Sequence, residues 1–263
     1  MKNAQLLLVA AASLIGACAP ADELSFEEQT ELADSNTSHD WTYEGEHGPK
    51  HWSELAAENE ACGHATTQSP VDLKAHTPVA DLPDLVHRYS DSAVAVHNTG
   101  HTIQYDYDKG SELKLGERTY ELVQLHFHAH SEHAVDGDFA PMELHLVHRD
   151  KAGSFLVVGV FIREGAHNRA LDDAGWGQLP RTHGQRLHDA QRRLRADALI
   201  PHGPSFRYAG SLTTPPCTEA VSWAIYERPI TMSRAQLEGF LQLYDHDFRP
   251  LQPLGERPLS HGE

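Results

Sequence analysis

The sequence has few basic residues, few cysteines and no apolar stretch long enough to cross a membrane. Lys and Arg total 21 against 38 Asp and Glu, which gives a formal net charge of -17. Because no net positive field attracts nucleic acid or an anionic lipid surface, we exclude nucleic acid as the main partner. The apolar stretch at residues 6–15 is shorter than the roughly 20 residues that a transmembrane helix needs. A diffusible small molecule remains as the expected ligand.

Repeats, low-complexity tracts and long linkers rich in Pro or Gly are also absent beyond about Trp41, which favours one folded domain over residues 39–263. A content of 40% hydrophobic and 22% charged residues is ordinary for a folded protein. Histidine is the abundant residue, with 20 copies. Since imidazole is both the commonest metal ligand and a proton carrier near neutral pH, the composition points to metal or proton chemistry.

Residues 1–21 have the pattern of a secretory signal peptide, because Lys2 precedes the apolar stretch and small residues follow it. Two processing sites stay open: a bacterial lipobox at residues 15–18, which would make Cys18 a lipid anchor, and ordinary cleavage after Ala21. Either route exports the chain, as a soluble periplasmic protein or as one anchored to the cell envelope. Residues 22–38 carry acidic but no basic side chains and few large apolar ones, which predicts a flexible acidic tether.

The chain has only 3 cysteines. Removal of Cys18, by cleavage or by lipidation, leaves Cys62 and Cys217. In an oxidising exported compartment we expect this pair to form a disulfide, with two buried free thiols as the alternative. Closing so long a loop would stabilise the fold by about 4 to 5 kcal/mol if the effect is one of chain entropy.

Alternating apolar and polar residues dominate the rest of the chain and predict strands. Helical patterns are few. Apolar residues spaced by three or four between Leu187 and Ala198 indicate one basic amphipathic helical segment, and Ser233 is a candidate cap for a helix over 234–244. We therefore expect a mainly β fold with a few short helices. The predicted strands are residues 93–96, 102–105, 122–128, 143–147, 155–162 and 221–226.

Three histidines stand out through their spacing. The strand period of two places Gln124, His126 and His128 on one face of a strand, and it places Glu143 and His145 on one face of a later one. If these two strands pair, three imidazoles converge. Such a set leaves a tetrahedral zinc ion one open position for a water. The glutamine and the glutamate lie two residues from a histidine, where each could hold an imidazole N–H and orient the ring.

A single histidine on a strand is more often a surface or core residue than a metal ligand. We assign most of the other histidines, His183 among them, to that class. His130, His133 and His148 lie close to the three in sequence, and we expect them to play supporting parts.

These residues resemble those of the α-class carbonic anhydrases. The resemblance runs from Trp41 to about Leu259 with its blocks in the family's order. It implies a single domain with a central, largely antiparallel twisted β-sheet. The blocks that carry it are His51-Trp52, Gln68 to Asp72, Asn98 to His101, Gln124 to His128, Ser131 to His133, Glu143 to His148, Ser211 to Pro216, Trp223, Arg249-Pro250 and Gln252 to Leu254.

The resemblance implies an enzyme that hydrates carbon dioxide reversibly to bicarbonate and a proton. His126, His128 and His145 match the ligands of one zinc ion per chain, and a zinc-bound hydroxide would be the nucleophile. Gln124 and Glu143 match residues that orient these ligands.

Other matches imply roles around the metal. Thr213 would accept the hydrogen of the hydroxide and donate its own to an ionised Glu132, which aims the nucleophile. His101 matches the proton shuttle, since an imidazole titrates near neutral pH, and Tyr43 would help to order the intervening water. The residues that match the substrate pocket are Thr214 on the bicarbonate side and Val147, Val157, Leu212, Val221 and Trp223 on the apolar side.

Cys62 and Cys217 occupy the positions of a disulfide in exported bacterial members, which often form homodimers. The sequence departs from the family at Ala129-His130, and at Ala140, where an aromatic residue is usual. An anchored zinc-binding protein without turnover is the alternative function. It is disfavoured because a storage site needs none of the residues that match catalytic positions.

Overall fold

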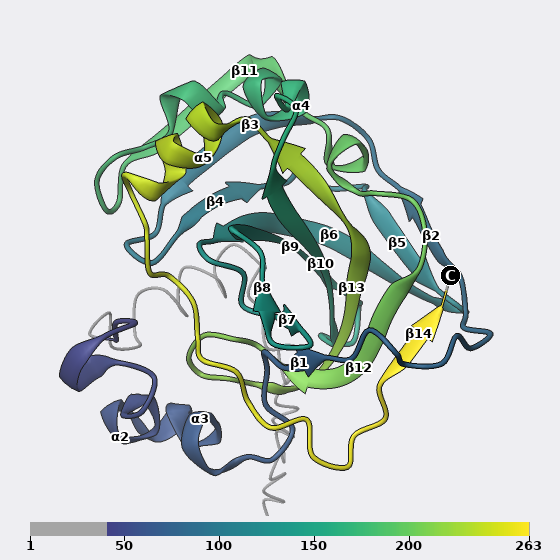
Figure 1. The fold of residues 1–263 in the computed structure, drawn as a ribbon. Helices are drawn as coiled ribbons and strands as arrows, with labels where there is room; N and C mark the ends of the chain where they lie inside the picture. The colour runs from purple at the N-terminus through teal and green to yellow at the C-terminus, as the bar shows by residue number, and fades with distance from the viewer. Residues whose placement is uncertain (1–40, 263) are drawn as a thin grey trace, which may run out of the picture. The chain divides into compact units, whose positions relative to one another are not determined.

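The computed structural model describes residues 41–262. The expected signal peptide, the acidic tether and Cys18 lie outside this range. The main feature of the described part is an 11-stranded sheet (Figure 1). The strands are β1 (Asp72–Leu73), β2 (Leu85–Arg88), β3 (Ser92–Asn98), β4 (Ile103–Asp106), β5 (Glu112–Leu115), β6 (Arg118–His128), β7 (Ala134–Val135), β8 (Asp138–Phe139), β9 (Met142–Arg149), β10 (Phe155–Glu164), β11 (Arg186–Leu194), β12 (Ser205–Ser211), β13 (Glu219–Met232) and β14 (Ser260–Gly262).

The large sheet has the order β11-β3-β4-β6-β9-β10-β13-β12-β14, and β5 pairs with both β6 and β2. Every neighbouring pair in it is antiparallel except β10 and β13, which run parallel. β1, β7 and β8 form a second, small sheet. The expected largely antiparallel β architecture is therefore confirmed, and each of the six predicted strands lies within or overlaps an observed one.

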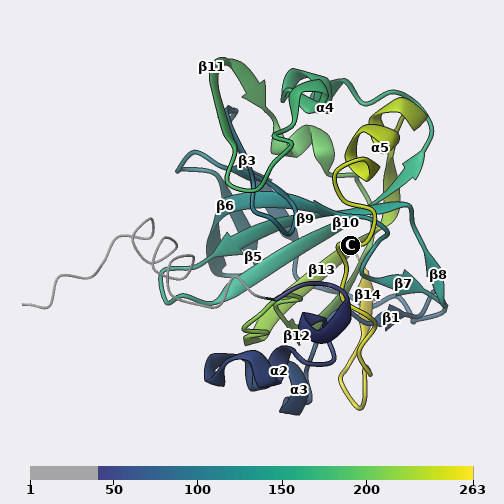
Figure 2. The same cartoon turned by 90° about the vertical axis from the view of Figure 1, so that its left-hand side faces the viewer.

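The helices are short. Figures 1 and 2 show α2 and α3 beside each other at one end of the molecule, and α4 near β11 with α5 beyond α4 at the other. None of the helices in residues 41–262 combines the length and the apolar character that a membrane span requires. The α-helices are α2 (Trp52–Leu55), α3 (Ala61–His64), α4 (Arg169–Asp173) and α5 (Arg234–Leu241), and the 3-10 helices are η1 (Gly45–His47), η2 (Ala57–Asn59), η3 (Trp176–Gln178) and η4 (Ala196–Leu199).

The predicted cap of the last helix is confirmed. Ser233 precedes α5 and accepts a hydrogen bond from the backbone N–H of Gln236, whose side chain reaches back to the Ser233 N–H. This reciprocal arrangement satisfies two donors at the start of the helix. The helix ends at Leu241, short of the predicted end at Tyr244.

The predicted amphipathic helix between Leu187 and Ala198 is wrong. Most of this segment is strand β11, which pairs with β3, and only its last part is helical, as the 3-10 turn η4. The pairing register shifts between Asp189 and Arg193. Extra residues in such an irregularity interrupt the alternation of inward and outward side chains. Leu187 and Leu194, seven residues apart, therefore lie on the same face of the strand, and the same spacing is found on one face of a helix.

Alternation along β6 and β9 separates the core from the candidate site. Leu125, Phe127, Leu144 and Leu146 are completely buried in the larger apolar cluster. Burying each such side chain contributes about 1.5 to 3 kcal/mol to folding. The residues between them, including His126, point to the opposite face of the sheet.

Candidate metal centre

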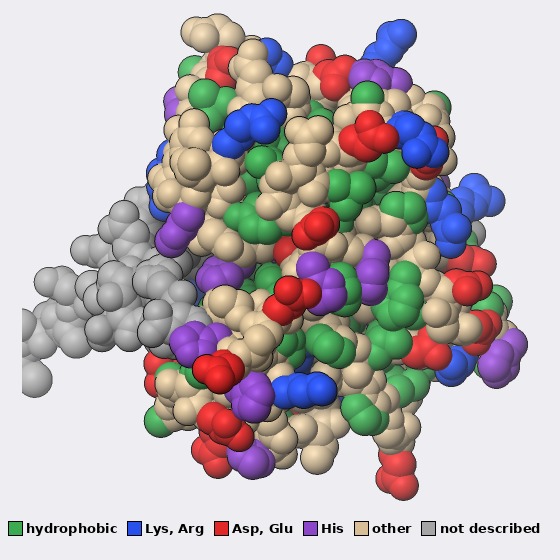
Figure 3. All heavy atoms as spheres, turned by 60° about the vertical axis from the view of Figure 1, so that its left-hand side comes forward, with side chains coloured by type: hydrophobic (Ala, Val, Ile, Leu, Met, Phe, Trp, Pro, Cys, Tyr) green, Lys and Arg blue, Asp and Glu red, His purple; other side chains and the backbone are tan. Residues whose placement is uncertain are grey.

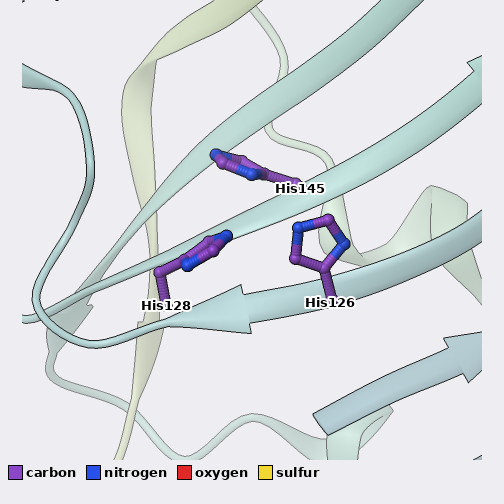
Figure 4. A group of neighbouring side chains, drawn as sticks. All are labelled: His126, His128 and His145. Atoms are coloured by element: carbon purple, nitrogen blue, oxygen red, sulfur yellow. The ribbon is translucent and has the colours of Figure 1, made fainter. Parts of the chain in front are cut away.

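The pairing of β6 with β9 brings the three predicted histidines together. His126 lies directly opposite His145 in the register, and His128 lies two residues further along β6. The ring centroids are 4.7 to 5.2 Å apart, and one nitrogen from each ring lies within 4.8 Å of the others. Figure 4 shows the three rings converging from the two strands.

The rings on β6 are held by their Nδ1 atoms. His126 Nδ1 lies 2.8 Å from Gln124 Oε1, and His128 Nδ1 lies 2.6 Å from the backbone oxygen of Asp247. Since both oxygens accept, each Nδ1 donates and each Nε2 carries the lone pair. His128 Nε2 is buried and has no hydrogen-bond partner within the described range. Both rings therefore present an Nε2 lone pair to the cluster.

His145 uses its other nitrogen. Its Nε2 lies 2.8 Å from Glu143 Oε1, which leaves Nδ1 to face the cluster. Glu143 also accepts from His133 Nδ1 at 2.8 Å and from the His133 backbone N–H at 2.9 Å, and His133 Nε2 contacts the Tyr208 hydroxyl at 2.7 Å. The group of His133, Glu143 and His145 is thus a hydrogen-bonded network that orients one ring, because its donors and acceptors already satisfy one another.

Burial fixes the charge state of these groups. It lowers the pKa of His126 well below the ordinary value, and the neighbouring His128 and His145 lower it further. Burial also lowers the pKa of His128. For the Glu143 carboxyl, burial raises the pKa, but His133 and His145 outweigh this and hold it well below the ordinary value. His126 and His128 are therefore neutral imidazoles, the form that binds a metal, and the Glu143 carboxylate is ionised.

This donor set fits a zinc ion. Three imidazoles converge, and among the described residues no fourth protein ligand joins them, which is the set that leaves one position open. The buried and unpartnered Nε2 of His128 would be costly to leave without a metal or hydrogen-bond donor. The held outer nitrogens fix the ring orientations that a metal requires.

The carboxyl of Glu132 lies on the metal-facing side of the cluster. Its Oε2 is 3.5 Å from His128 Nε2 and 3.9 Å from His145 Nδ1. Its Oε1 accepts from the Arg249 backbone N–H at 2.8 Å. Within residues 41–262, Oε2 is buried without a hydrogen-bond partner. Glu132 is thus positioned by one oxygen and keeps the other available to a donor.

The segment that carries Thr213 is tied down by a disulfide. Cys62 and Cys217 form this bond, as predicted from the sequence. The Cys217 N–H donates to the Thr214 oxygen at 2.8 Å, and the Gln68 side-chain amide donates to the Cys217 oxygen at 3.1 Å. Thr213 itself is buried. The bond therefore connects α3 to the loop between β12 and β13 that holds Thr213 and Thr214.

His101 and Tyr43 lie in an aromatic group with Trp41 and Trp52. The His101 ring stacks on Trp41 with centroids 3.6 Å apart and planes at 9°. The Tyr43 ring packs edge-on against both tryptophans, and its hydroxyl is buried without a hydrogen-bond partner among the described residues. Burial, followed by the charges of Glu132 and Asp247, raises the pKa of Tyr43 well above its ordinary value. Tyr43 therefore stays a neutral hydroxyl.

The residues that match the substrate pocket lie on the same face of the sheet. Val147, Val157, Val221 and Trp223 are buried in one apolar cluster, and Leu212 packs against it. The Trp223 ring is also 4.9 Å from the His145 ring. Thr214 is partly exposed in the adjacent loop. An apolar surface thus adjoins the three imidazoles.

Two site residues were given no role from the sequence. Asp247 holds His128 through its backbone oxygen and accepts from the Ala129 N–H at 2.7 Å through its carboxyl. Arg249 holds Glu132 through its backbone N–H, while its guanidinium donates to the Cys62 oxygen at 2.8 Å. Arg249 belongs to the Arg249-Pro250 block that carries the family resemblance. Its contact with Glu132 is made by the backbone, however, and the sequence does not reveal contacts that any residue type could make.

The departure at Ala140 is accommodated locally. Ala140 is buried, its N–H donates to Ser131 Oγ at 2.9 Å, and its oxygen accepts from the Ser131 N–H at 2.9 Å. The neighbouring Phe139 is 40% exposed and packs against the His130 ring. These contacts hold the chain between Glu132 and Glu143 in place with a small residue at position 140.

Comparisons with known proteins agree with this geometry. The family model for eukaryotic-type carbonic anhydrase matches residues 47–262. A carbonic anhydrase of Nostoc sp. is 40% identical over 226 residues, covering 82% of this chain and 84% of the relative, and one of Pectobacterium atrosepticum is 35% identical over 231 residues, covering 87% and 93%. The structure of an α-carbonic anhydrase from Thermovibrio ammonificans with the inhibitor sulfanilamide matches with a TM-score of 0.80 at 38% identity, covering 85% of this chain and 98% of that one.

Proposed function

The chain belongs to the eukaryotic-type, or α, carbonic anhydrase family and is a carbonic anhydrase, and we propose that it uses one zinc ion held by His126, His128 and His145. The observation that carries this metal assignment is the convergence of three imidazoles, of which His128 and His145 are buried and His126 is partly buried, whose outer nitrogens are already bonded. A zinc ion held there would lower the pKa of a bound water, as in carbonic anhydrases generally, and would so supply the nucleophile for carbon dioxide.

Thr213 and Glu132 orient the attacking oxygen in this proposal. If the Thr213 hydroxyl donates to Glu132 Oε2, its own oxygen can only accept, and it fixes where the hydrogen of the attacking oxygen points. Support comes from Glu132, whose Oε1 is occupied by the Arg249 N–H while Oε2 is buried without another partner in the described range. An ionised carboxylate in that place accepts a hydroxyl hydrogen strongly.

Carbon dioxide binds, in this proposal, against the apolar surface beside the imidazoles. The molecule has almost no hydrogen-bonding capacity, so Val147, Val157, Val221, Leu212 and Trp223 suit it better than polar side chains would. Water is excluded from such a surface, which favours the small apolar substrate over competing solvent. Bicarbonate, the polar product, then forms beside the Thr214 hydroxyl.

His101 carries the released proton toward buffer, and Tyr43 helps to order the water between it and the metal. An imidazole exchanges protons efficiently near neutral pH. The stacking of His101 on Trp41 supports this role, because it keeps the ring at a defined place on the edge of the site. The neutral Tyr43 hydroxyl is buried without a hydrogen-bond partner among the described residues, so it can bond to a single water enclosed in the site.

The decisive experiment is stopped-flow hydration of carbon dioxide by the purified protein, combined with its metal content. We expect about one zinc per chain and fast hydration that sulfanilamide inhibits. Zinc at that stoichiometry without hydration would favour the zinc-binding protein without turnover, and fast hydration by metal-free protein would refute the assignment of the metal.

We also propose that the chain is exported, with residues 1–21 as signal peptide and 22–38 as tether. The Cys62–Cys217 disulfide supports an oxidising compartment, for which the periplasm is the expected site. A lipid on Cys18 would anchor the protein to the cell envelope. A lipid-sized mass increment on a mature chain beginning at Cys18 would establish the anchor, and a chain beginning at Asp22 would refute it.

A further inference from the structure

The ring of His183 lies against the turn that carries His101. This turn joins β3 to β4, and Gly100 has a φ of +89° within it. A Cβ atom on Gly100 would lie 3.1 Å from both Cδ2 and Cγ of His183, closer than ordinary packing permits. The imidazole of His183 therefore occupies the space over the residue that immediately precedes His101.

Backbone hydrogen bonds fix this neighbourhood. The Asn98 N–H donates to the Gln185 oxygen at 3.0 Å, and the Gly184 N–H donates to the Asn98 oxygen at 2.9 Å. The Asn98 side chain adds a bond from Nδ2 to the Pro180 oxygen at 3.2 Å. The loop on both sides of His183 is thus bonded to the end of β3, so the backbone beside His183 and the backbone beside His101 are held together.

His183 is also open to solvent, as an exposed residue just before β11. Figure 3 shows several histidine side chains on one face of the molecule. His101 differs, because it is partly buried and one face of its ring is covered by Trp41. The exposed imidazole of His183 therefore lies against the turn that carries the less accessible imidazole of His101.

We propose that His183 is a second proton acceptor, which takes the proton from His101 and delivers it to buffer. This inference rests on the proposed shuttle role of His101. In the step, an N–H bond of the His101 imidazolium breaks and its electron pair stays on that nitrogen. The proton passes, directly or through intervening water, to the lone pair of the neutral His183 ring. A buffer base then removes it, which restores both imidazoles.

The test is the maximal rate of hydration in weak buffer for His183→Ala, with His188→Ala as matched control. His188 is an exposed histidine of β11 that pairs with Ala95, away from the Gly100 turn. We expect His183→Ala to lower kcat about twofold, because one of the two imidazoles on the proposed proton path is removed. kcat/KM should not change, since it reports the step before proton release, and added imidazole should restore kcat.

A double-variant comparison separates the outcomes. If His183 acts through His101, its removal has no further effect on kcat in a His101→Ala background. An equal decrease in both backgrounds, or a kcat of His183→Ala equal to that of the His188→Ala control, would overturn the relay while leaving the shuttle in place. An unchanged kcat in His101→Ala alone would overturn the shuttle and the relay with it.

Discussion

Replacing both Cys62 and Cys217 by serine should lower the free energy of unfolding by about 5 kcal/mol, on a chain-entropy estimate, for two residues separated by 155 positions. The loss arises mainly in the unfolded state, because the contacts around the bond are made by backbone. Arg249 donates to the Cys62 oxygen and Gln68 to the Cys217 oxygen, and serine retains both acceptors. Since folded domains are stable by about 5 to 15 kcal/mol, the variant should still fold at room temperature but with little margin.

Urea unfolding followed by tryptophan fluorescence measures this change, with the midpoint and the slope fitted separately. The control is the native protein with and without a reductant, which should weaken it to the level of the double-serine variant and leave that variant unaffected. Zinc should remain bound to the variant, since neither cysteine contacts the three imidazoles. A free energy of unfolding within about 1 kcal/mol of the native value, at an unchanged slope, would show that the chain-entropy reasoning does not apply here.

Three further predictions concern single histidines. His145→Ala should lose zinc and hydration together, measured by metal analysis and stopped flow, whereas His188→Ala should keep both; normal turnover in zinc-free protein would contradict the metal mechanism. His101→Ala should have a lower kcat that imidazole buffer partly restores, and an undiminished rate would show that protons leave by another path. Burial lowers the pKa of His148 from its ordinary 6.5 to about 3, so the unfolded state binds more protons between these values. The free energy of unfolding should therefore fall by up to about 1.4 kcal/mol per pH unit as pH drops through this window, and urea titrations of His148→Leu should show a shallower slope.

Much of the site was visible in the sequence because it is local to two strands. The period of two placed Gln124, His126 and His128 on one face, and the same period placed Glu143 beside His145. The pairing of β6 with β9 was then sufficient to bring the three histidine rings together. The cap at Ser233 was also predictable from the sequence, because a capping box depends on only four consecutive residues.

Residues distant in sequence contribute contacts that only the tertiary structure decided. The backbone oxygen that holds His128 comes from Asp247, and the N–H that holds Glu132 comes from Arg249, and neither contact depends on a side chain that a pattern could reveal. The closeness of His183 to the His101 turn likewise depends on how the loop before β11 packs on β3.

The secondary structure of the segment between Leu187 and Ala198 was likewise decided by the tertiary structure. The spacing of its apolar residues is compatible with a helix, but the segment pairs with β3 and is a strand. The register shift after Asp189 interrupts the alternation of apolar and polar residues by which a strand is recognised. The sequence by itself determined which residues could bind a metal, because strand geometry acts over a few residues. The tertiary structure decided how those residues are oriented and which partners support them, because hydrogen bonds to backbone and strand pairing join positions that the linear order does not relate.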